Sequence, residues 1–131
     1  MNGVDIKDRA ASATGALAPS QGERAAGAIV KHIVMWNVRA DTPDQRADGI
    51  ARIKAGFEAL RGRIPGMLAI EIGVDSSGVD YACDVVLYSE FESQAALDDY
   101  ATHPAHLALR DALEGVRIAR HQVDYRAEPT R

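Results

Sequence analysis

The run Ile29–Val38, IVKHIVMWNV, limits the possible folds of this chain more than any other stretch. It is rich in β-branched and large apolar residues, which favour a β-strand. Alternate residues of a strand point to opposite faces, and here both faces are apolar. One face carries Val30, His32, Val34 and Trp36. Ile33 and Met35 lie on the other, so the run predicts a central strand that is buried on both sides.

The elements that follow can build a sheet around this strand. Thr42-Pro43-Asp44-Gln45 has the pattern of a capping box, and the apolar spacing after it predicts a helix that ends before Pro65-Gly66. A second helical stretch begins after Ser93, breaks at Pro104 and stops near Gly115. The other predicted strands are Met67–Val74, Ala82–Phe91 and Val116–Tyr125.

The resulting order, β-α-β-β-α-β, is that of an α+β ferredoxin-like fold with helices on one face of a four-stranded antiparallel sheet. Ile33, Met35 and Val86 would then be exposed on the other face of a monomer. An apolar surface of this kind needs a cover. We therefore expect a homodimer through the open face of the sheet, in which two sheets form a dimeric α+β barrel.

The 131 residues predict one folded domain over residues 28–126. Residues 1–27 are rich in Ala, Gly and Ser and lack periodicity, which is typical of a disordered tail or a leader; the alternative is an arm that packs on a partner subunit. Residues 127–131 form a polar C-terminal tail.

Charge and cysteine content argue against several functional classes. The net charge is −4 and the basic residues are dispersed, which argues against nucleic acid as a partner. No apolar run has membrane-spanning length. The single cysteine, Cys83, precludes an intrachain disulfide and fits a reducing compartment, so we expect a cytoplasmic location.

The stretch YATHPAHLALRDAL, residues 100–113, contains the clearest chemical signal. Proline is favoured at the first position of a helix, so a new helix should begin at Pro104 with His103 as its cap. His106 shares a helical face with Leu109 and Leu113 and should therefore point inward.

Five segments together resemble one family: KHIVMWNV, the IPGM turn, YACDVVLYSEF, YATHPAH and the closing VDY. Over about residues 29 to 126 the chain resembles the stress-responsive dimeric A/B barrel (Dabb) family. That family includes plant stress-induced proteins, bacterial proteins of unknown role and the plant olivetolic acid cyclase. This cyclase closes a linear polyketide by aldol condensation without a cofactor, in a cavity between helices and sheet.

The resemblance to the cyclase implies a role for several individual residues of this chain. The catalytic histidine of that cyclase corresponds to His106, its tyrosine to Tyr100, and a histidine of its first strand to His32. A further pocket histidine is replaced by Cys83, which makes the pocket less basic and leaves the substrate open. The apolar candidates for ligand contact are Trp36, Phe57 and Leu109.

Physical chemistry supports a base at His106. Burial and the positive end of a helix dipole both disfavour imidazolium, so the ring should be neutral near pH 7. Tyr100 could donate a hydrogen bond to a developing oxyanion. The alternative is that Tyr100, His106 and His32 only satisfy one another inside a core.

Two functions therefore remain open. One is a cofactor-free lyase-, cyclase- or isomerase-type enzyme that binds a small, partly apolar carbonyl compound in a pocket between helices and sheet. The other is a non-catalytic stress-responsive or ligand-binding homodimer. Beside these two, the fold alone also leaves a monooxygenase-like relative on the same barrel open. We predict no metal site, because His103 and His106 with Asp84 match closed metal geometry poorly. Asp84, inside an apolar strand, should pair with Arg110 or Arg120.

Overall fold

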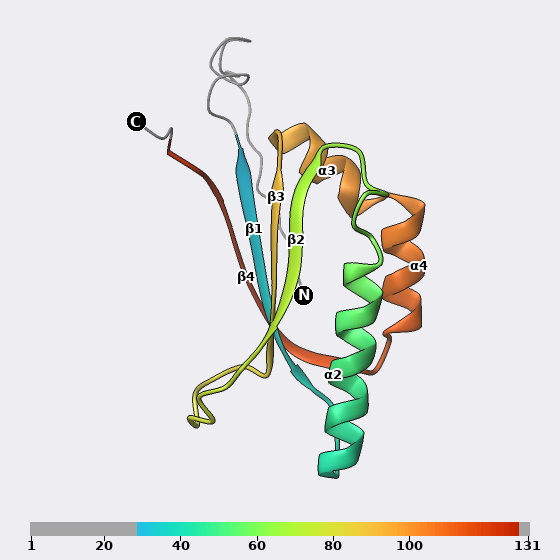
Figure 1. Ribbon diagram of the computed structural model, residues 1–131, viewed down its shortest axis with the longest axis vertical. Coiled ribbons are helices and arrows are strands. Elements are labelled where there is room, and N and C mark those ends of the chain that lie inside the picture. Colours follow the sequence, from blue (N-terminus) through green and yellow to red (C-terminus); the bar gives the residue numbers. More distant parts are fainter. Residues whose placement is uncertain (1–28, 129–131) are drawn as a thin grey trace.

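The computed structural model describes residues 29–128 and contains one antiparallel sheet (Figure 1). Its strands are β1 (Val30–Val38), β2 (Met67–Val74), β3 (Val85–Phe91) and β4 (Arg117–Arg126). They lie in the order β2-β3-β1-β4, so β1 is central, as its apolar faces predict. This arrangement confirms the ferredoxin-like prediction.

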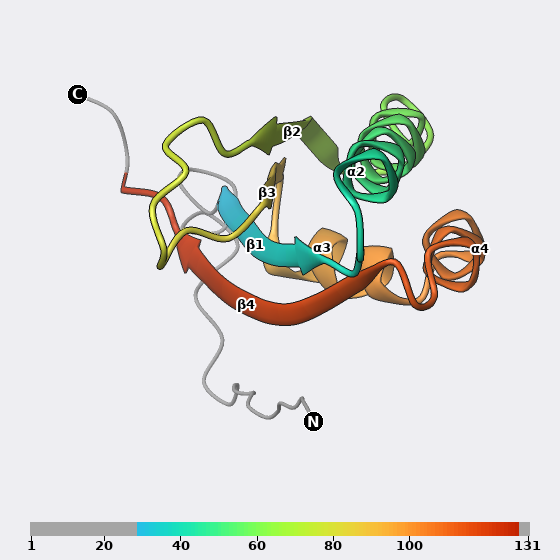
Figure 2. The same ribbon diagram turned by 90° about the horizontal axis from the view of Figure 1, so that it is seen from below.

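Three helices, α2 (Pro43–Glu58), α3 (Gln94–Ala101) and α4 (Pro104–Ala112), lie on the same side of the sheet (Figure 2). Thr42 caps α2 by accepting a hydrogen bond from the Gln45 amide at 3.1 Å. Ser93 caps α3 in the same way, through the Ala96 amide at 3.1 Å. The break between α3 and α4 falls at Pro104, as predicted.

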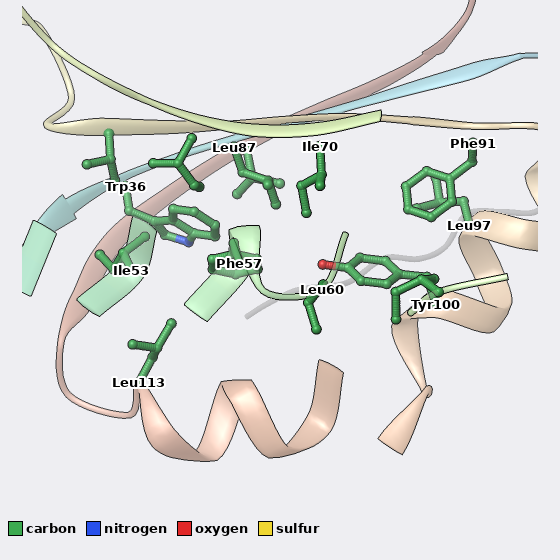
Figure 3. Packing of buried hydrophobic residues seen from close by; sticks show 14 of the residues in the cluster. Trp36, Ile53, Phe57, Leu60, Ile70, Leu87, Phe91, Leu97, Tyr100 and Leu113 are labelled. Carbon is green, nitrogen blue, oxygen red and sulfur yellow. The ribbon is translucent and has the colours of Figure 1, made fainter. Parts of the chain in front are cut away.

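Side chains of β1 alternate between the two faces of the sheet. Val30, His32, Val34, Trp36 and Val38 are buried on the helix side. There they join a core that includes Phe57 of α2, Phe91 of β3 and Tyr100 of α3 (Figure 3). The core lies between the sheet and the helices.

Two predicted boundaries are wrong. The first helix was expected to continue until just before Pro65 but ends at Glu58, after which backbone hydrogen bonds join residues three apart, as from the Arg61 amide to the Glu58 carbonyl. Bonds of this i→i−3 kind tighten the last turn of a helix and satisfy its final carbonyl groups. The third strand begins at Val85 rather than Ala82, because the residues before it belong to the preceding loop.

The face of the sheet that carries no helix is partly apolar. Met35 is 38% exposed on β1, and Val123 and Tyr125 are exposed on β4. Val123 pairs with Ile33 and Tyr125 with Lys31, so these side chains share one face.

The predicted tail, residues 1–27, lies outside the described residues. Within residues 29–128, no helix has the length and apolarity needed to cross a membrane.

Candidate functional site

The break between α3 and α4 places Tyr100 beside His106. His103 caps α4, and its Nδ1 accepts a hydrogen bond from the Ala105 amide at 3.0 Å. Tyr100 lies in the last turn of α3 and His106 in the first turn of α4, and their ring centroids are 4.3 Å apart. The capping role predicted for His103 is confirmed, and His106 contacts Tyr100 while remaining partly exposed.

The hydrogen bonding of His106 defines its tautomer. Its Nδ1 lies 3.1 Å from the carbonyl oxygen of Ala101, which can only accept a hydrogen bond. Nδ1 therefore carries the proton, and in the neutral ring Nε2 keeps a free lone pair. Burial lowers the pKa of His106 to about 4; the bond to Ala101 opposes this shift, and the charge of Arg110 adds to it. The ring is thus a neutral base at physiological pH.

This pKa gives a testable pH dependence. We expect His106 to titrate near pH 4 in the folded protein, compared with an ordinary value of 6.5. Between these values the unfolded chain binds more protons than the folded one, so stability decreases as pH falls from about 6.5 to about 4. NMR of the imidazole resonances measures the titration, and loss of one signal in His106→Asn assigns it. A titration midpoint of His106 above pH 6 would contradict the neutral base. In His106→Asn, the loss of stability between about pH 6.5 and pH 4 that is due to this imidazole should disappear.

Tyr100 is 2% exposed, and its hydroxyl oxygen has no hydrogen-bond partner among the described residues. Burial raises the pKa of Tyr100, whereas Arg117 and Arg120 act in the opposite direction. The hydroxyl therefore stays protonated and can donate. Figure 3 shows it pointing into the middle of the layer between sheet and helices.

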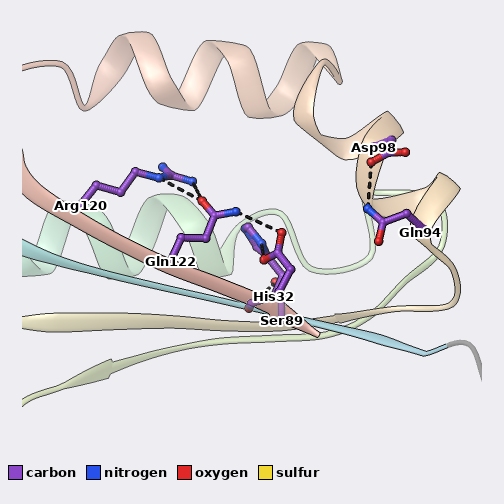
Figure 4. A network of polar contacts seen from close by, with 7 residues as sticks. His32, Ser89, Gln94, Asp98, Arg120 and Gln122 are labelled. Atoms are coloured by element: carbon purple, nitrogen blue, oxygen red, sulfur yellow. Dashed lines mark hydrogen bonds and ion pairs between the residues drawn. The ribbon is translucent and has the colours of Figure 1, made fainter. Parts of the chain in front are cut away.

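A chain of polar side chains lies on the helix side of β1 and β4 (Figure 4). His32 Nδ1 lies 2.6 Å from Asp124 Oδ1, and Gln122 Nε2 donates to Asp124 Oδ2 at 3.1 Å. Arg120 Nε donates to Gln122 Oε1 at 3.1 Å. The His32 and Tyr100 rings meet edge to face with centroids 6.2 Å apart, so this network joins the Tyr100–His106 pair.

The other predicted site residues make different contacts from the Tyr100–His106 pair. Trp36 and Phe57 are buried and stacked, with ring centroids 5.5 Å apart. Leu109 packs so closely on α2 that a Cβ at Gly56 would lie 2.4 Å from its Cδ1. Cys83 lies in the loop before β3, at the end of that strand remote from His32, and so is not brought together with the histidines.

Sequence reasoning missed the contribution of β4. Arg120, Gln122 and Asp124 recur at every second position, and this polar alternation was the available signal that they share one face. Arg117 lies beyond an irregularity in the strand, which no local pattern revealed.

The predicted partner of Asp84 was wrong. Its Oδ1 lies 2.5 Å from Arg46 of α2, and its Oδ2 accepts from the Val38 amide at 2.8 Å, so neither Arg110 nor Arg120 is used. Asp84 lies in the loop before β3, close to the end of β1 and the start of α2, where Arg46 is the nearer cation. Within residues 29–128 no group of three or more His, Cys, Asp or Glu residues is arranged to hold a metal ion.

Comparison with known proteins places this fold in a family. The sequence matches the stress responsive A/B barrel domain over residues 30–127. A dimeric protein of unknown function and ferredoxin-like fold from Bacteroides fragilis is 33% identical, with a TM-score of 0.68 and coverage of 76% of this chain and 96% of that one. A Dabb family protein from Mesorhizobium loti is 24% identical, with a TM-score of 0.56 and coverage of 75% and 95%.

A hydroxynitrile lyase from Passiflora edulis has a similar structure at 19% identity, with a TM-score of 0.62 and coverage of 79% of this chain and 97% of that one. A search of curated proteins gives no match. The match over residues 30–127 takes in every strand and helix described above. This chain therefore belongs to the stress responsive A/B barrel domain family.

Proposed function

We propose that this chain is a cofactor-independent, cytoplasmic lyase- or cyclase-type enzyme that acts on a small, partly apolar carbonyl compound. One observation carries the proposal. A neutral imidazole with a free Nε2 lies against a tyrosine whose buried hydroxyl has no partner among the described residues. A buried polar group without a partner is costly, which is understandable if a substrate oxygen supplies the partner.

The chemistry follows from these two groups. His106 Nε2 removes a proton from the carbon next to a substrate carbonyl, and the C–H electron pair becomes that of an enolate. Tyr100 donates a hydrogen bond to the enolate oxygen. The enolate then recovers the proton from His106, or attacks a second carbonyl carbon, whose oxygen takes the C=O electron pair and then that proton. No external oxidant or reductant is needed. His32, held by Asp124, orients a polar group of the substrate.

Proton exchange tests this proposal without knowledge of the natural substrate. Acetophenone and 4-phenyl-2-butanone are incubated with the protein in D₂O, and loss of the α-proton signals is followed by NMR. We expect exchange above the buffer rate. Exchange at the buffer rate across a panel of such ketones would contradict the enzyme proposal and favour the alternative, a non-catalytic stress-responsive or ligand-binding homodimer. The filled core around Trp36 and Phe57 is the observation that favours this alternative.

We also propose that the chain is a homodimer through the open face of its sheet. Met35, Val123 and Tyr125 form an exposed apolar surface there. The solved relatives from Bacteroides fragilis and Thermobifida fusca are described as dimeric. Burial of this surface against a second copy would stabilise the assembly.

The dimer proposal predicts the effect of Met35→Glu. A carboxylate near the centre of two facing sheets would lose its hydration, so we expect a monomer at micromolar concentration where the wild type is a dimer. Sedimentation velocity distinguishes the two. Leu107→Glu is the matched control, because Leu107 is 39% exposed on α4, away from the open face. A wild type that sediments as a monomer would contradict the proposal.

A further inference from the structure

Strand β4 contains a bulge that changes which of its side chains face the helices. Met35 pairs with His121 and Asn37 with Ile118, so three steps on β4 match two on β1. Ala119 takes up the extra residue with a φ of 56°. A bulge can redirect a side chain to the other face of the sheet.

The bulge brings Arg117 and Arg120 to the same face. Arg117 pairs with Val38, which is buried on the helix side. Arg120 donates to Gln122, whose pairing partner Val34 is also buried on that side. In a regular strand, residues three apart would point to opposite faces. The strained Ala119 is therefore what allows two guanidinium groups to face the helices together.

Both guanidinium groups lie against the core aromatics. The Arg117 guanidinium carbon is 4.7 Å from the centroid of the Trp36 ring and 5.5 Å from that of Phe57, and that of Arg120 is 5.9 Å from Trp36. Neither arginine has a carboxylate within ion-pair distance among residues 29–128. Burial, with the charges of Arg120 and Arg110, lowers the pKa of Arg117 to about 10.

The positive charge extends to the proposed catalytic pair. Arg117 influences the pKa of both Tyr100 and His106, and Arg120 influences that of Tyr100. The arginines and the reacting groups thus share one electrostatic environment. Burial lowers the pKa of Arg120, and Asp124, reached through Gln122, raises that pKa but lies beyond ion-pair distance. Cation–π contact alone explains one stacked guanidinium, but it does not explain two like charges on one ring with no carboxylate in direct contact.

We propose that Arg117 and Arg120 form a subsite for an anionic oxyacid group, a carboxylate or a phosphate, carried by the same substrate whose carbonyl lies beside His106. Paired guanidinium groups match such oxyanions in geometry and charge. This inference rests on the proposed function for the location of the carbonyl. It narrows the substrate class from carbonyl compounds in general to carbonyl compounds with an acidic group.

Trp36 makes the subsite measurable, because it is the single tryptophan and touches both guanidinium groups. The probes are 4-oxo-4-phenylbutanoate and its uncharged methyl ester, titrated against the full chain by Trp fluorescence. We expect the wild type to bind the acid roughly 10- to 100-fold more tightly than the ester. Acetate and inorganic phosphate, added as competitors, show which oxyanion the subsite prefers.

Arg117→Met and Arg120→Met should each reduce that preference, because methionine keeps an apolar stem over Trp36 but removes the charge. Arg63→Met, a change of the same charge at an exposed position, should retain it. Circular dichroism checks the fold of each variant, and Arg120→Met is the informative variant if Arg117→Met does not fold, because Arg120 is more exposed. Equal binding of acid and ester by the wild type, or an unchanged preference in Arg120→Met, would overturn the subsite.

The two proposals can fail separately. An acid preference that His106→Ala retains and the arginine variants lose, without any proton exchange, would support the subsite and contradict the enzyme. Proton exchange that depends on His106, with no preference for the acid over the ester, would support the enzyme and contradict the subsite.

Discussion

Replacing His106 with alanine should slow proton exchange in a ketone substrate by roughly 100- to 10,000-fold, the usual contribution of a positioned general base. The expectation rests on the tautomer. Because Nδ1 donates to Ala101, the lone pair of the neutral ring is on Nε2, and the low pKa of about 4 keeps it there across the physiological range. NMR-detected exchange in D₂O measures the loss.

His103 provides the matched control, three positions earlier at the start of the same helix. Its role is to cap α4 through the Ala105 amide, and asparagine is among the best capping residues. His103→Asn should therefore leave both the exchange rate and the fold unchanged. If His103→Asn were as slow as His106→Ala, the effect would reflect the helix break as a whole and not a base at His106.

Much of the fold could be predicted because its determinants are local. Thr42 and Pro104 define helix starts through capping and through the fixed φ of proline, and the apolar faces of Ile29–Val38 require a central strand. The end of α2 was not predicted, because the apolar spacing continues through Leu60 and Ile64, whereas the backbone hydrogen bonds beyond the helix end join residues three apart.

Only part of the site was predictable, because only some of its contacts are local in the sequence. Tyr100 and His106 lie close in the sequence, so the helix break alone brings their rings together. Asp124 meets His32 through the pairing of β1 with β4, and Arg117 faces the helices because of the bulge at Ala119. Strand register is a non-local property, and a shift by one residue reverses every side chain. The partner of Asp84 was mispredicted because the loop before β3 meets α2, a contact that is also far apart in the sequence.

Tyr100→Phe should lower the exchange rate and raise the stability of the protein. The hydroxyl is buried without a partner among the described residues, so its removal relieves a desolvation cost that is typically about 1–3 kcal/mol. Phenylalanine keeps the ring contacts with Phe91 and His106, whose centroids lie 5.1 and 4.3 Å away, and leaves no cavity of ring size. Exchange should fall by roughly 100- to 1,000-fold, as for loss of one oxyanion donor.

Urea unfolding followed by circular dichroism, at one fixed protomer concentration because a dimer would unfold in a concentration-dependent way, gives the stability change. Tyr88→Phe is the matched control: its hydroxyl donates to Glu90 at 2.5 Å on the open face of the sheet, so its loss should not stabilise the protein and should not alter exchange. A Tyr100→Phe variant that is less stable would mean that the hydroxyl has a structural partner. If Tyr100→Phe gains stability and loses activity, the hydroxyl serves the reaction and not the fold. This is the trade-off expected of a group that donates to a substrate oxygen.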